Sequence, residues 1–219
     1  MAATNPSPAH RVAALPMDAT APVVLVVDDD IDVRESLSDL FGSIGIDSQL
    51  FGSTRELLDA GLPDRPSCLV LDLRLPGASG LELQTRLAEM DAGIPIIFIT
   101  GHADVPTSVR AMKAGAIDFL PKPFREQELL DVVAQALRLD EARRREAGAV
   151  AEVRRLAATL TPREMDVLRG VQRGLLNKQI AYELGVTEIT VKMHRSSAGR
   201  KLKTSSVADL VRKVTLLAL

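Results

Sequence analysis

The sequence predicts two domains of different fold class, an α/β domain followed by an all-α domain. In the first half, five short apolar runs alternate with segments of helical hydrophobic spacing, which indicates a five-stranded parallel, doubly wound (βα)5 sheet. Near the C-terminus four helices are expected, two of them joined by a tight turn that contains glycine, as in a helix-turn-helix. Charge divides the chain in the same way: residues 22–124 hold 8 Lys and Arg against 16 Asp and Glu, whereas residues 160–219 hold 11 against 5. The basic half is therefore a candidate for binding nucleic acid.

The composition limits the class of protein. The chain has 219 residues, 46% hydrophobic and 26% charged, which gives room for two ordinary domains. Its single cysteine, Cys68, excludes a disulfide within the chain and a metal cluster made of cysteine alone, and is expected to be a small buried residue of a strand. No apolar run approaches the roughly 18 residues of a membrane span. We expect residues 1–21, which contain several prolines, to be a disordered tail of a cytoplasmic protein.

The α/β domain is expected over residues 22–138, with a helix after each strand. The predicted strands are 23–27, 46–51, 68–72, 94–100 and 116–120. The predicted helices begin after Asp30, at Ser53, at Leu81, at Val105 and near Arg125. No Gly-x-Gly-x-x-Gly motif follows any strand, so a dinucleotide-binding fold of the usual kind is disfavoured.

The polar residues with chemical potential in this domain lie just past the ends of strands. Asp28 and Asp29 follow the first strand, and Asp72 ends the third. Thr100 and Lys122 stand at the ends of the fourth and fifth. Because the carboxyl ends of parallel strands share one edge of the sheet, we expect these five side chains to converge there.

This combination of residue types is suited to phosphoryl chemistry. Three carboxylates at one place repel one another unless a cation lies between them, and Mg²⁺ (or Mn²⁺) prefers such oxygen ligands. A lysine ammonium and a threonine hydroxyl could then contact the oxygens of a phosphoryl group on Asp72. Taken singly, each residue also fits a structural role, such as a charged helix N-terminus, a turn or a solvated loop. The position of all five at strand ends favours the phosphoryl interpretation.

Four motifs in residues 22–138 resemble the receiver domain of two-component response regulators. They are Val-Val-Asp-Asp-Asp at 26–30, Leu-Asp-Leu-Arg-Leu-Pro-Gly at 71–77, Ile-Thr-Gly-His-Ala-Asp at 99–104 and Asp-Phe-Leu-Pro-Lys-Pro-Phe at 118–124. The order, spacing and identity of these residues all agree with that family. The resemblance implies that Asp72 accepts phosphate from a sensor histidine kinase.

The same resemblance implies roles for other residues at this edge. The implied ligands of Mg²⁺ are Asp28, Asp29, Asp72 and the backbone carbonyl of Arg74. Lys122 would contact the phosphoryl group, and a cis Lys122–Pro123 bond is expected. Thr100 and Phe119 would be the switch pair that reorients on phosphorylation. The switch aromatic is Phe where Tyr is common in the family.

Residues 139–157 are expected to form a helical linker, because they are rich in Ala, Arg and Glu. We expect the last helix of the α/β domain to continue through this segment, with a break or loosening near Gly148. A solvated spacer is the favoured interpretation. A dimer-forming segment is the alternative, although its apolar residues form only an incomplete seam.

The all-α domain is expected over residues 158–219. Thr161, Asn177 and Thr187 are predicted to cap its first three helices, and a fourth is expected at about 206–217. On the third helix, Val191 and Ala198 belong to a line that should face the core. The opposite face and its borders are basic and polar, with Lys192, Met193, His194, Arg195, Ser196, Arg200, Lys201 and Lys203. Such a helix suits the major groove of DNA, and a solvated amphipathic helix is the alternative.

This domain resembles the LuxR-type helix-turn-helix. The match rests on Leu-Thr-Pro-Arg-Glu at 160–164, Gly-Leu-Leu-Asn-Lys-Gln-Ile-Ala at 174–181 and Thr-Val-Lys-Met-His-Arg at 190–195, extended by Lys-Leu-Lys at 201–203 and Leu-Val-Arg at 210–212. The resemblance implies that Lys192 and Met193 face bases, and that Lys178, Thr190 and His194 lie near the backbone. The full set expected to bind DNA is Lys178, Thr190, Lys192, Met193, His194, Ser196, Arg200 and Lys201. Ala198 stands where a larger apolar residue is usual.

Together the two halves resemble the FixJ branch of the FixJ/NarL response regulators. The resemblance implies that phosphorylation of Asp72 by a sensor histidine kinase promotes a homodimer and sequence-specific binding to double-stranded DNA, and so regulates transcription. RNA polymerase is a further possible partner, and no membrane association is expected. Such a protein is not a turnover enzyme, although self-dephosphorylation is compatible with its site.

Two other classes of protein are weighed against this interpretation. A phosphatase of the haloacid-dehalogenase kind also uses an Asp nucleophile at a strand end, but it needs a second acid two residues later, where this chain has Arg74. A DNA-binding or adaptor protein with a vestigial receiver domain is the other alternative. The complete set of five strand-end residues argues against it.

Overall fold

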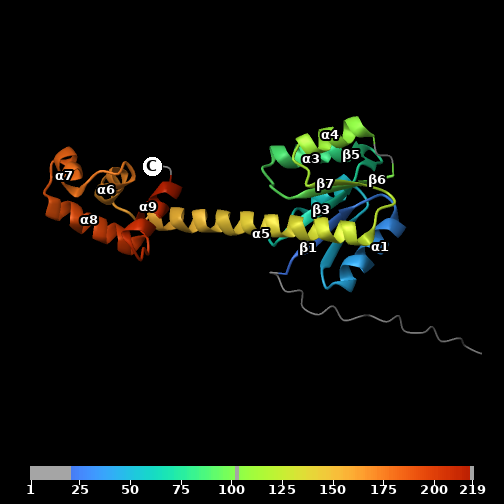
Figure 1. The fold of residues 1–219 in the computed structure, drawn as a ribbon, viewed down its shortest axis with the longest axis horizontal. Helices are drawn as coiled ribbons and strands as arrows, with labels where there is room; N and C mark the ends of the chain where they lie inside the picture. Colours follow the sequence, from blue (N-terminus) through green and yellow to red (C-terminus); the bar gives the residue numbers. More distant parts are fainter. Residues whose placement is uncertain (1–20, 102–103, 218–219) are drawn as a thin grey trace, which may run out of the picture. The chain divides into compact units, whose positions relative to one another are not determined.

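A five-stranded parallel sheet forms the centre of the first half of the chain, with the strand order β2-β1-β3-β6-β7 (Figure 1). Its strands are β1 (Val23–Val27), β2 (Asp47–Phe51), β3 (Ser67–Asp72), β6 (Ile96–Thr100) and β7 (Asp118–Pro121). The three central strands are buried along their whole length, which explains why they contain almost only apolar residues. The predicted doubly wound sheet is confirmed.

The computed structural model describes residues 21–101 and 104–217, and the chain divides into two units after Ala142. Except for Ala21, the predicted tail lies outside the described residues, as do His102 and Ala103 of the third receiver motif. Within the described part of the chain, no helix is both long enough and apolar enough to cross a membrane.

Helices cover both faces of the sheet because alternate strand residues point to opposite sides. Val24 and Val26 of β1 pack in one apolar cluster with residues of α1 (Ile31–Ser43) and of α5 (Glu126–Ala157). Val23, Leu25 and Val27 pack in the other cluster, to which the remaining three helices contribute. These are α2 (Thr54–Ala60), α3 (Gly80–Glu89) and α4 (Val105–Lys113). Figure 1 shows α3 and α4 together on the side of the sheet away from α1.

Cys68 lies in the cluster beneath α1 and α5 and is fully buried, as predicted. Burial, together with the negative charge of Asp140, raises the pKa of its thiol to about 12. Asp140 is itself fully buried in α5, where its carboxylate accepts a hydrogen bond of 2.9 Å from the backbone N–H of Ser67. This bond fixes α5 to the first residue of β3.

A short hairpin that was not predicted follows Asp72. Its strands are β4 (Arg74–Leu75) and β5 (Ala78–Ser79), joined at Pro76-Gly77, where Gly77 has a positive φ of 80°. The hairpin returns the chain to α3, whose first residue is Gly80. A Cβ atom on Gly80 would lie 2.6 Å from the carbonyl oxygen of Asp72, so only glycine allows α3 to begin this close to the end of β3.

The break predicted near Gly148 is wrong, because α5 is continuous from Glu126 to Ala157. A glycine in a helix interior costs only about 1 kcal/mol relative to alanine. Good helix formers on both sides of Gly148 (the segment is Arg-Arg-Arg-Glu-Ala-Gly-Ala-Val-Ala-Glu) outweigh that cost.

The second unit is helical, as predicted. After the end of α5 it contains α6 (Pro162–Gln172), α7 (Asn177–Leu184), α8 (Glu188–Lys201) and α9 (Val207–Leu216). One apolar cluster joins the end of α5 to α6, α8 and α9, and a second joins α6, α7 and the start of α8. Gly185, in the left-handed conformation at φ 64°, forms the turn between α7 and α8.

Two of the three predicted helix caps in this unit are confirmed. The side chains of Thr161 and Thr187 accept hydrogen bonds from the backbone N–H groups three residues later. The cap predicted at Asn177 is wrong, because Asn177 is the first residue of α7 and Leu176 occupies the cap position. There the Gln179 side chain accepts the N–H of Leu176 at 2.8 Å. The side chain of Asn177 instead accepts a hydrogen bond from Arg195 of α8.

Alanine substitution of two helical glycines should have opposite effects. Gly148→Ala places a Cβ with no described atom within 4 Å and should stabilise α5 by about 1 kcal/mol. Gly170→Ala places a Cβ 2.7 Å from the side chain of Ile180, and should destabilise the packing of α6 on α7 by about 1–3 kcal/mol. Thermal unfolding and amide hydrogen exchange measure both effects. Equal exchange rates in α5 for Gly148→Ala and wild type would contradict the expectation for this helix.

Candidate functional site: an acid–lysine centre and a basic helical unit

Two of the predicted strand-end acids, Asp28 and Asp72, meet around the ammonium group of Lys122. The Nζ atom of Lys122 lies 2.6 Å from Oδ2 of Asp28 and 2.9 Å from Oδ2 of Asp72. Asp28 and Asp72 are buried, and Lys122 is mostly so, with 22% of its side chain exposed. The one ammonium therefore compensates two carboxylates that would otherwise repel one another in a desolvated position.

The second oxygen of each carboxylate is held by its own loop. Oδ1 of Asp28 accepts the backbone N–H of Asp30 at 3.0 Å, and Oδ1 of Asp72 accepts the backbone N–H of Arg74 at 2.9 Å. In both cases the donor lies two residues after the acid. The ends of β1 and β3 thus hold their carboxylates in the same manner, with Lys122 between them.

The surroundings of these groups shift their proton affinities. Burial raises the pKa of Asp28, and the ammonium of Lys122 and the amide of Asp30 offset only part of this effect. Partial burial acts to lower the pKa of Lys122, but hydrogen bonds to Asp28 and Asp72 and their charges outweigh it, so that the pKa is raised. Lys122 is consequently a permanent cation at physiological pH.

The donor set at this edge fits a hard divalent cation. Asp28, Asp29 and Asp72 each offer a carboxylate oxygen, and these oxygens all lie within 4.8 Å of one another. Asp29 is exposed and the other two are buried, so the cluster opens to solvent on one side. Oxygen atoms from several carboxylates are the ligands that Mg²⁺ selects. The residues present therefore fit the metal that the sequence predicts.

The predicted switch residues lie on neighbouring strands beside the acid–lysine centre. Thr100 ends β6 and is buried, and its carbonyl oxygen accepts the N–H of Lys122 at 2.7 Å. Phe119 of β7 is half-buried, with its ring centroid 6.3 Å from that of Phe98. The expected cis Lys122–Pro123 bond is present.

One residue at this centre was missed by the sequence analysis. Arg34, in the first turns of α1, donates from Nη1 to the carbonyl oxygen of Asp28 at 2.6 Å. It fixes the backbone that presents Asp28 and Asp29. The signal in the sequence was a single basic residue in the helix that follows three consecutive acids, and its target, a carbonyl group, leaves no trace in a residue pattern.

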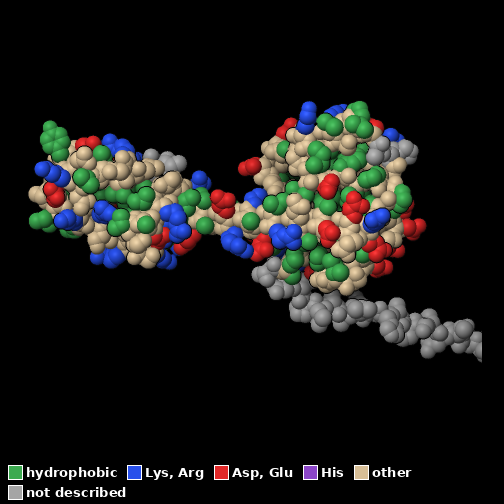
Figure 2. Space-filling view, in the orientation of Figure 1, with side chains coloured by type: hydrophobic (Ala, Val, Ile, Leu, Met, Phe, Trp, Pro, Cys, Tyr) green, Lys and Arg blue, Asp and Glu red, His purple; other side chains and the backbone are tan. Residues whose placement is uncertain are grey.

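The residues predicted to bind DNA lie on the surface of α7 and α8. Lys178, Lys192 and Met193 are exposed, and Thr190 is half-buried. Ser196 and Arg200 are exposed and His194 is half-buried. On the face shown in Figure 2, Lys and Arg side chains gather on this second unit, and Asp and Glu side chains gather on the first.

Lys201 has a partner inside its own unit. Its ammonium lies 2.7 Å from a carboxylate oxygen of Glu164, which is buried in α6, and donates to the carbonyl oxygen of Thr159 at 3.1 Å. Burial acts to raise the pKa of Glu164, but Lys201, the hydroxyl of Ser197 and the N–H of Thr161 outweigh it and lower the pKa to about 2. This pairing gives Lys201 a structural role that the helical pattern did not reveal.

The fold and the two sites define a class of protein. A parallel α/β domain with paired acids and a lysine at its strand ends, followed by a basic helix-turn-helix unit, is the architecture of a response regulator with a DNA-binding domain. Residues 24–134 match the family model of the response regulator receiver domain, and residues 158–214 match that of bacterial regulatory proteins of the luxR family.

Similar proteins narrow this class. Nodulation protein W of Bradyrhizobium diazoefficiens is 54% identical over 194 residues, which cover 89% of this chain and 86% of that protein. Response regulator protein TodT of Pseudomonas putida is 47% identical, covering 90% and 86%. Transcriptional regulatory protein FixJ of Azorhizobium caulinodans is 42% identical, covering 88% and 92%.

Solved structures of response regulators are also similar to this chain over most of its length. The response regulator StyR is 49% identical with a TM-score of 0.79, covering 90% of this chain and 99% of that one. Full-length FixJ from B. japonicum is 36% identical with a TM-score of 0.55, covering 91% and 98%. The chain belongs to the FixJ/NarL family of two-component response regulators, in its FixJ-like branch. The family regulates transcription and is not a class of turnover enzymes.

The Glu164–Lys201 pair should make the stability of the second unit depend on pH. The pKa of Glu164 is lowered on folding, so its contribution is complete above the ordinary value of 4.5 and is lost as the pH falls towards about 2. Glu164→Gln should remove this dependence and cost about 1–2 kcal/mol at neutral pH. Hydrogen exchange of amides in residues 158–217 of the full chain measures both effects.

The matched control is Glu188→Gln, which removes an exposed carboxylate from the first turn of α8. It should retain the loss of protection between pH 4.5 and 2 that wild type shows. If wild type and Glu164→Gln lose protection in parallel over this interval, the pair does not contribute as described.

Proposed function

We propose that this chain is a transcriptional regulator switched by phosphorylation of Asp72. A sensor histidine kinase donates the phosphate, the phosphorylated receiver domain forms a homodimer, and the paired basic units bind double-stranded DNA at specific sequences. The observation that carries the proposal is the contact of one ammonium, that of Lys122, with both Asp28 and Asp72. A buried lysine between two acids at strand ends is an arrangement suited to receiving a dianionic group.

Asp72 is the nucleophile in this proposal. One of its carboxylate oxygens attacks the phosphorus of a phosphohistidine on the kinase, the P–N bond breaks, and the imidazole leaves. Lys122 is already 2.9 Å from Asp72, so its ammonium can pair with a phosphoryl oxygen after only a small movement. Arg74 anchors the other carboxylate oxygen through its N–H, which keeps the acceptor oriented.

Asp28, Asp29 and Asp72, with the backbone carbonyl of Arg74, would hold Mg²⁺ (or Mn²⁺). The ion supplies positive charge that neutralises the phosphoryl oxygens. Asp28 is oriented for this role by Arg34 and by the N–H of Asp30.

Phosphorylation would be signalled through Thr100 and Phe119. The Thr100 hydroxyl would bond a phosphoryl oxygen, and the half-buried ring of Phe119 would follow the movement of Thr100 inwards. The neighbouring helix α4 exposes three apolar side chains, Val105, Val109 and Met112, spaced four and three residues apart. A change at this surface is suited to promoting a receiver dimer.

In the DNA complex, α8 would lie in the major groove with Lys192 and Met193 facing bases. Lys178, Thr190 and His194 would contact the backbone, and Ser196 and Arg200 extend the same face. Lys201 is not part of this set, because its ammonium is paired with Glu164. A regulator of this kind acts in the cytoplasm, where RNA polymerase is a further possible partner.

The two other classes are less well supported. A phosphatase of the haloacid-dehalogenase kind would need an acidic residue at position 74. This chain has an arginine there, and its side chain is exposed. A vestigial receiver would not need the buried group of Asp28, Asp72 and Lys122. Burying charged groups costs free energy even when they are paired, so their presence favours a functional site.

Asp72→Asn tests the switch. Wild-type protein treated with Mg²⁺ and a small phosphodonor such as acetyl phosphate should form a dimer, so that its molecular mass in solution doubles. Its affinity for DNA should rise by about tenfold or more, which is a typical size for an allosteric coupling. Asp72→Asn should show neither change. Light scattering and fluorescence anisotropy with labelled duplex measure the two effects. Equal DNA affinity for both proteins under all conditions would support the phosphorylation-independent alternative.

Asp29→Asn tests the metal site. It removes one ligand charge from an exposed position, so Mg²⁺ affinity should fall by about tenfold or more. Asp30→Asn is the matched control, because Asp30 is the exposed N-cap of α1 and Asn caps a helix equally well. Titration with Mg²⁺, followed by amide chemical shifts of the β1–α1 loop, gives both affinities. A similar loss in the two variants would argue against a specific role for Asp29.

A further inference from the structure

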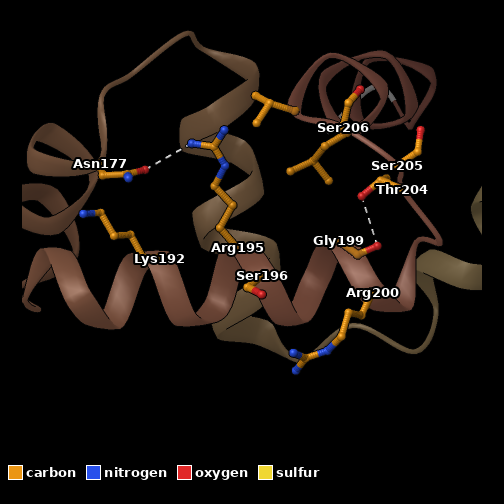
Figure 3. Close-up of a pocket in the computed structure, with 11 residues that line it drawn as sticks. Asn177, Lys192, Arg195, Ser196, Gly199, Arg200, Thr204, Ser205 and Ser206 are labelled. Atoms are coloured by element: carbon orange, nitrogen blue, oxygen red, sulfur yellow. Dashed lines mark hydrogen bonds between the residues drawn. The ribbon is translucent and has the colours of Figure 1, made fainter.

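A cavity of about 430 Å³ lies in the second unit between α7, α8 and the start of α9 (Figure 3). Its polar lining includes Asn177, Lys192, Arg195, Ser196, Arg200 and Ser206. Among the described residues that line it, none is acidic. The cavity is therefore positively charged and rich in hydrogen-bond donors, a combination that attracts an anion.

The cations of this cavity differ from those of the rest of the unit. Eleven Lys and Arg residues occur between residues 160 and 217, all of them described. Seven form ion pairs with carboxylates: Arg163, Arg169, Arg173, Lys201, Lys203, Arg212 and Lys213. The four without a carboxylate partner among the described residues are Lys178, Lys192, Arg195 and Arg200, and the last three line the cavity. Positive charge that the fold does not neutralise is thus concentrated here.

Two of these cations point into the cavity. In Figure 3 the side chains of Lys192 and Arg195 extend from α8 towards Asn177 at the start of α7, whereas Arg200 points away from them. Nη1 of Arg195 donates to Oδ1 of Asn177 at 3.2 Å. A guanidinium has five N–H donors, and this bond uses one of them while it fixes the direction of the group. Asn177 thus positions Arg195 with donors to spare.

We propose that this cavity receives a phosphodiester group of the DNA backbone, held by Arg195, with Asn177 as the positioning residue for Arg195. The inference rests on the DNA binding proposed above and adds Arg195 and Asn177 to the residues involved. Arg195 provides paired N–H donors that match phosphate geometry, and the charge of Lys192 in the lining adds to the positive potential of the cavity. The serine hydroxyls at the start of α9 lie across the cavity and add donors from a second helix.

The position of the cavity favours a DNA phosphate over a small free anion. Lys192, Ser196 and Arg200 line it and also belong to the face of α8 that is proposed to enter the major groove. A strand that borders the groove passes this face, and a contact at its phosphate would fix the register of α8 on the duplex. The contact would strengthen binding to every sequence to a similar degree and would not itself select one.

The test compares the salt dependence of DNA binding in four full-length proteins. Arg195→Gln removes the charge and keeps a donor for Asn177, Arg195→Lys keeps the charge, and Arg169→Gln removes an ion-paired charge from α6 away from the cavity. Anisotropy with a labelled random-sequence duplex is measured between 0.05 and 0.2 M salt. Thermal unfolding of each variant checks that the fold is retained.

One lost phosphate contact should reduce the slope of log K against log salt by about 0.9, and the affinity at 0.05 M salt by roughly tenfold. Arg195→Gln should show this loss, whereas Arg195→Lys should keep the slope and Arg169→Gln should behave as wild type. An equal slope for Arg195→Gln and Arg169→Gln, with DNA still bound, overturns the cavity assignment and leaves the proposed function intact. Failure of wild type itself to bind DNA at 0.05 M salt overturns the proposed function as well.

A second measurement separates a DNA phosphate from a free one. Inorganic phosphate is titrated into the wild-type protein while the Nε–H resonance of Arg195 is followed by NMR. A shift on adding duplex, with none on adding millimolar phosphate, supports the backbone contact. Saturable binding of inorganic phosphate together with an unchanged slope in Arg195→Gln would identify a small-anion site and overturn the proposal.

Discussion

The contact of Lys122 with two buried acids is the constraint on which the first unit depends. Asp28 and Asp72 stand on adjacent strands, and without a cation between them they would oppose the pairing of β1 with β3 that buries the sheet. Lys122 follows β7, which lies next to β6 and runs parallel to the other strands, so its side chain starts from the same edge of the sheet as Asp28 and Asp72. The parallel topology therefore brings the three charged groups of this centre together.

The two units use their charges differently. In the receiver domain the ammonium of Lys122 is engaged with two acids, Asp28 and Asp72, and the charges of the site are compensated within the fold. In the helical unit the pair formed by Glu164 and Lys201 joins α6 to α8. The lowered pKa of Glu164 reflects how well its carboxylate is compensated. Among the described residues 160–217, the cations that lack a carboxylate partner lie on α7 and α8, and three of them line the cavity beside Asn177.

How much could be predicted from the sequence depended on the range of the interaction. The strands and the convergence of their terminal residues were predictable, because parallel topology leaves one place for strand-end side chains. The continuity of α5 through Gly148 could not be predicted in this way, because it depends on the sum of many small helix propensities. Lys201 appeared to face solvent in the helical pattern, and only the folded position of Glu164, 37 residues away, shows its partner. Arg34 was missed for a similar reason, because it bonds a backbone group.

The buried thiol of Cys68 has a practical consequence. The chain has no other cysteine, and a thiol that has a pKa of about 12 and is fully buried in β3 resists alkylation and oxidation at physiological pH. A cysteine introduced at any surface position would therefore be the one reactive thiol, without removal of the native residue. Spin or fluorescent labels could be attached to α4 or α8 one at a time, so that movements of each unit can be followed in the otherwise unaltered protein.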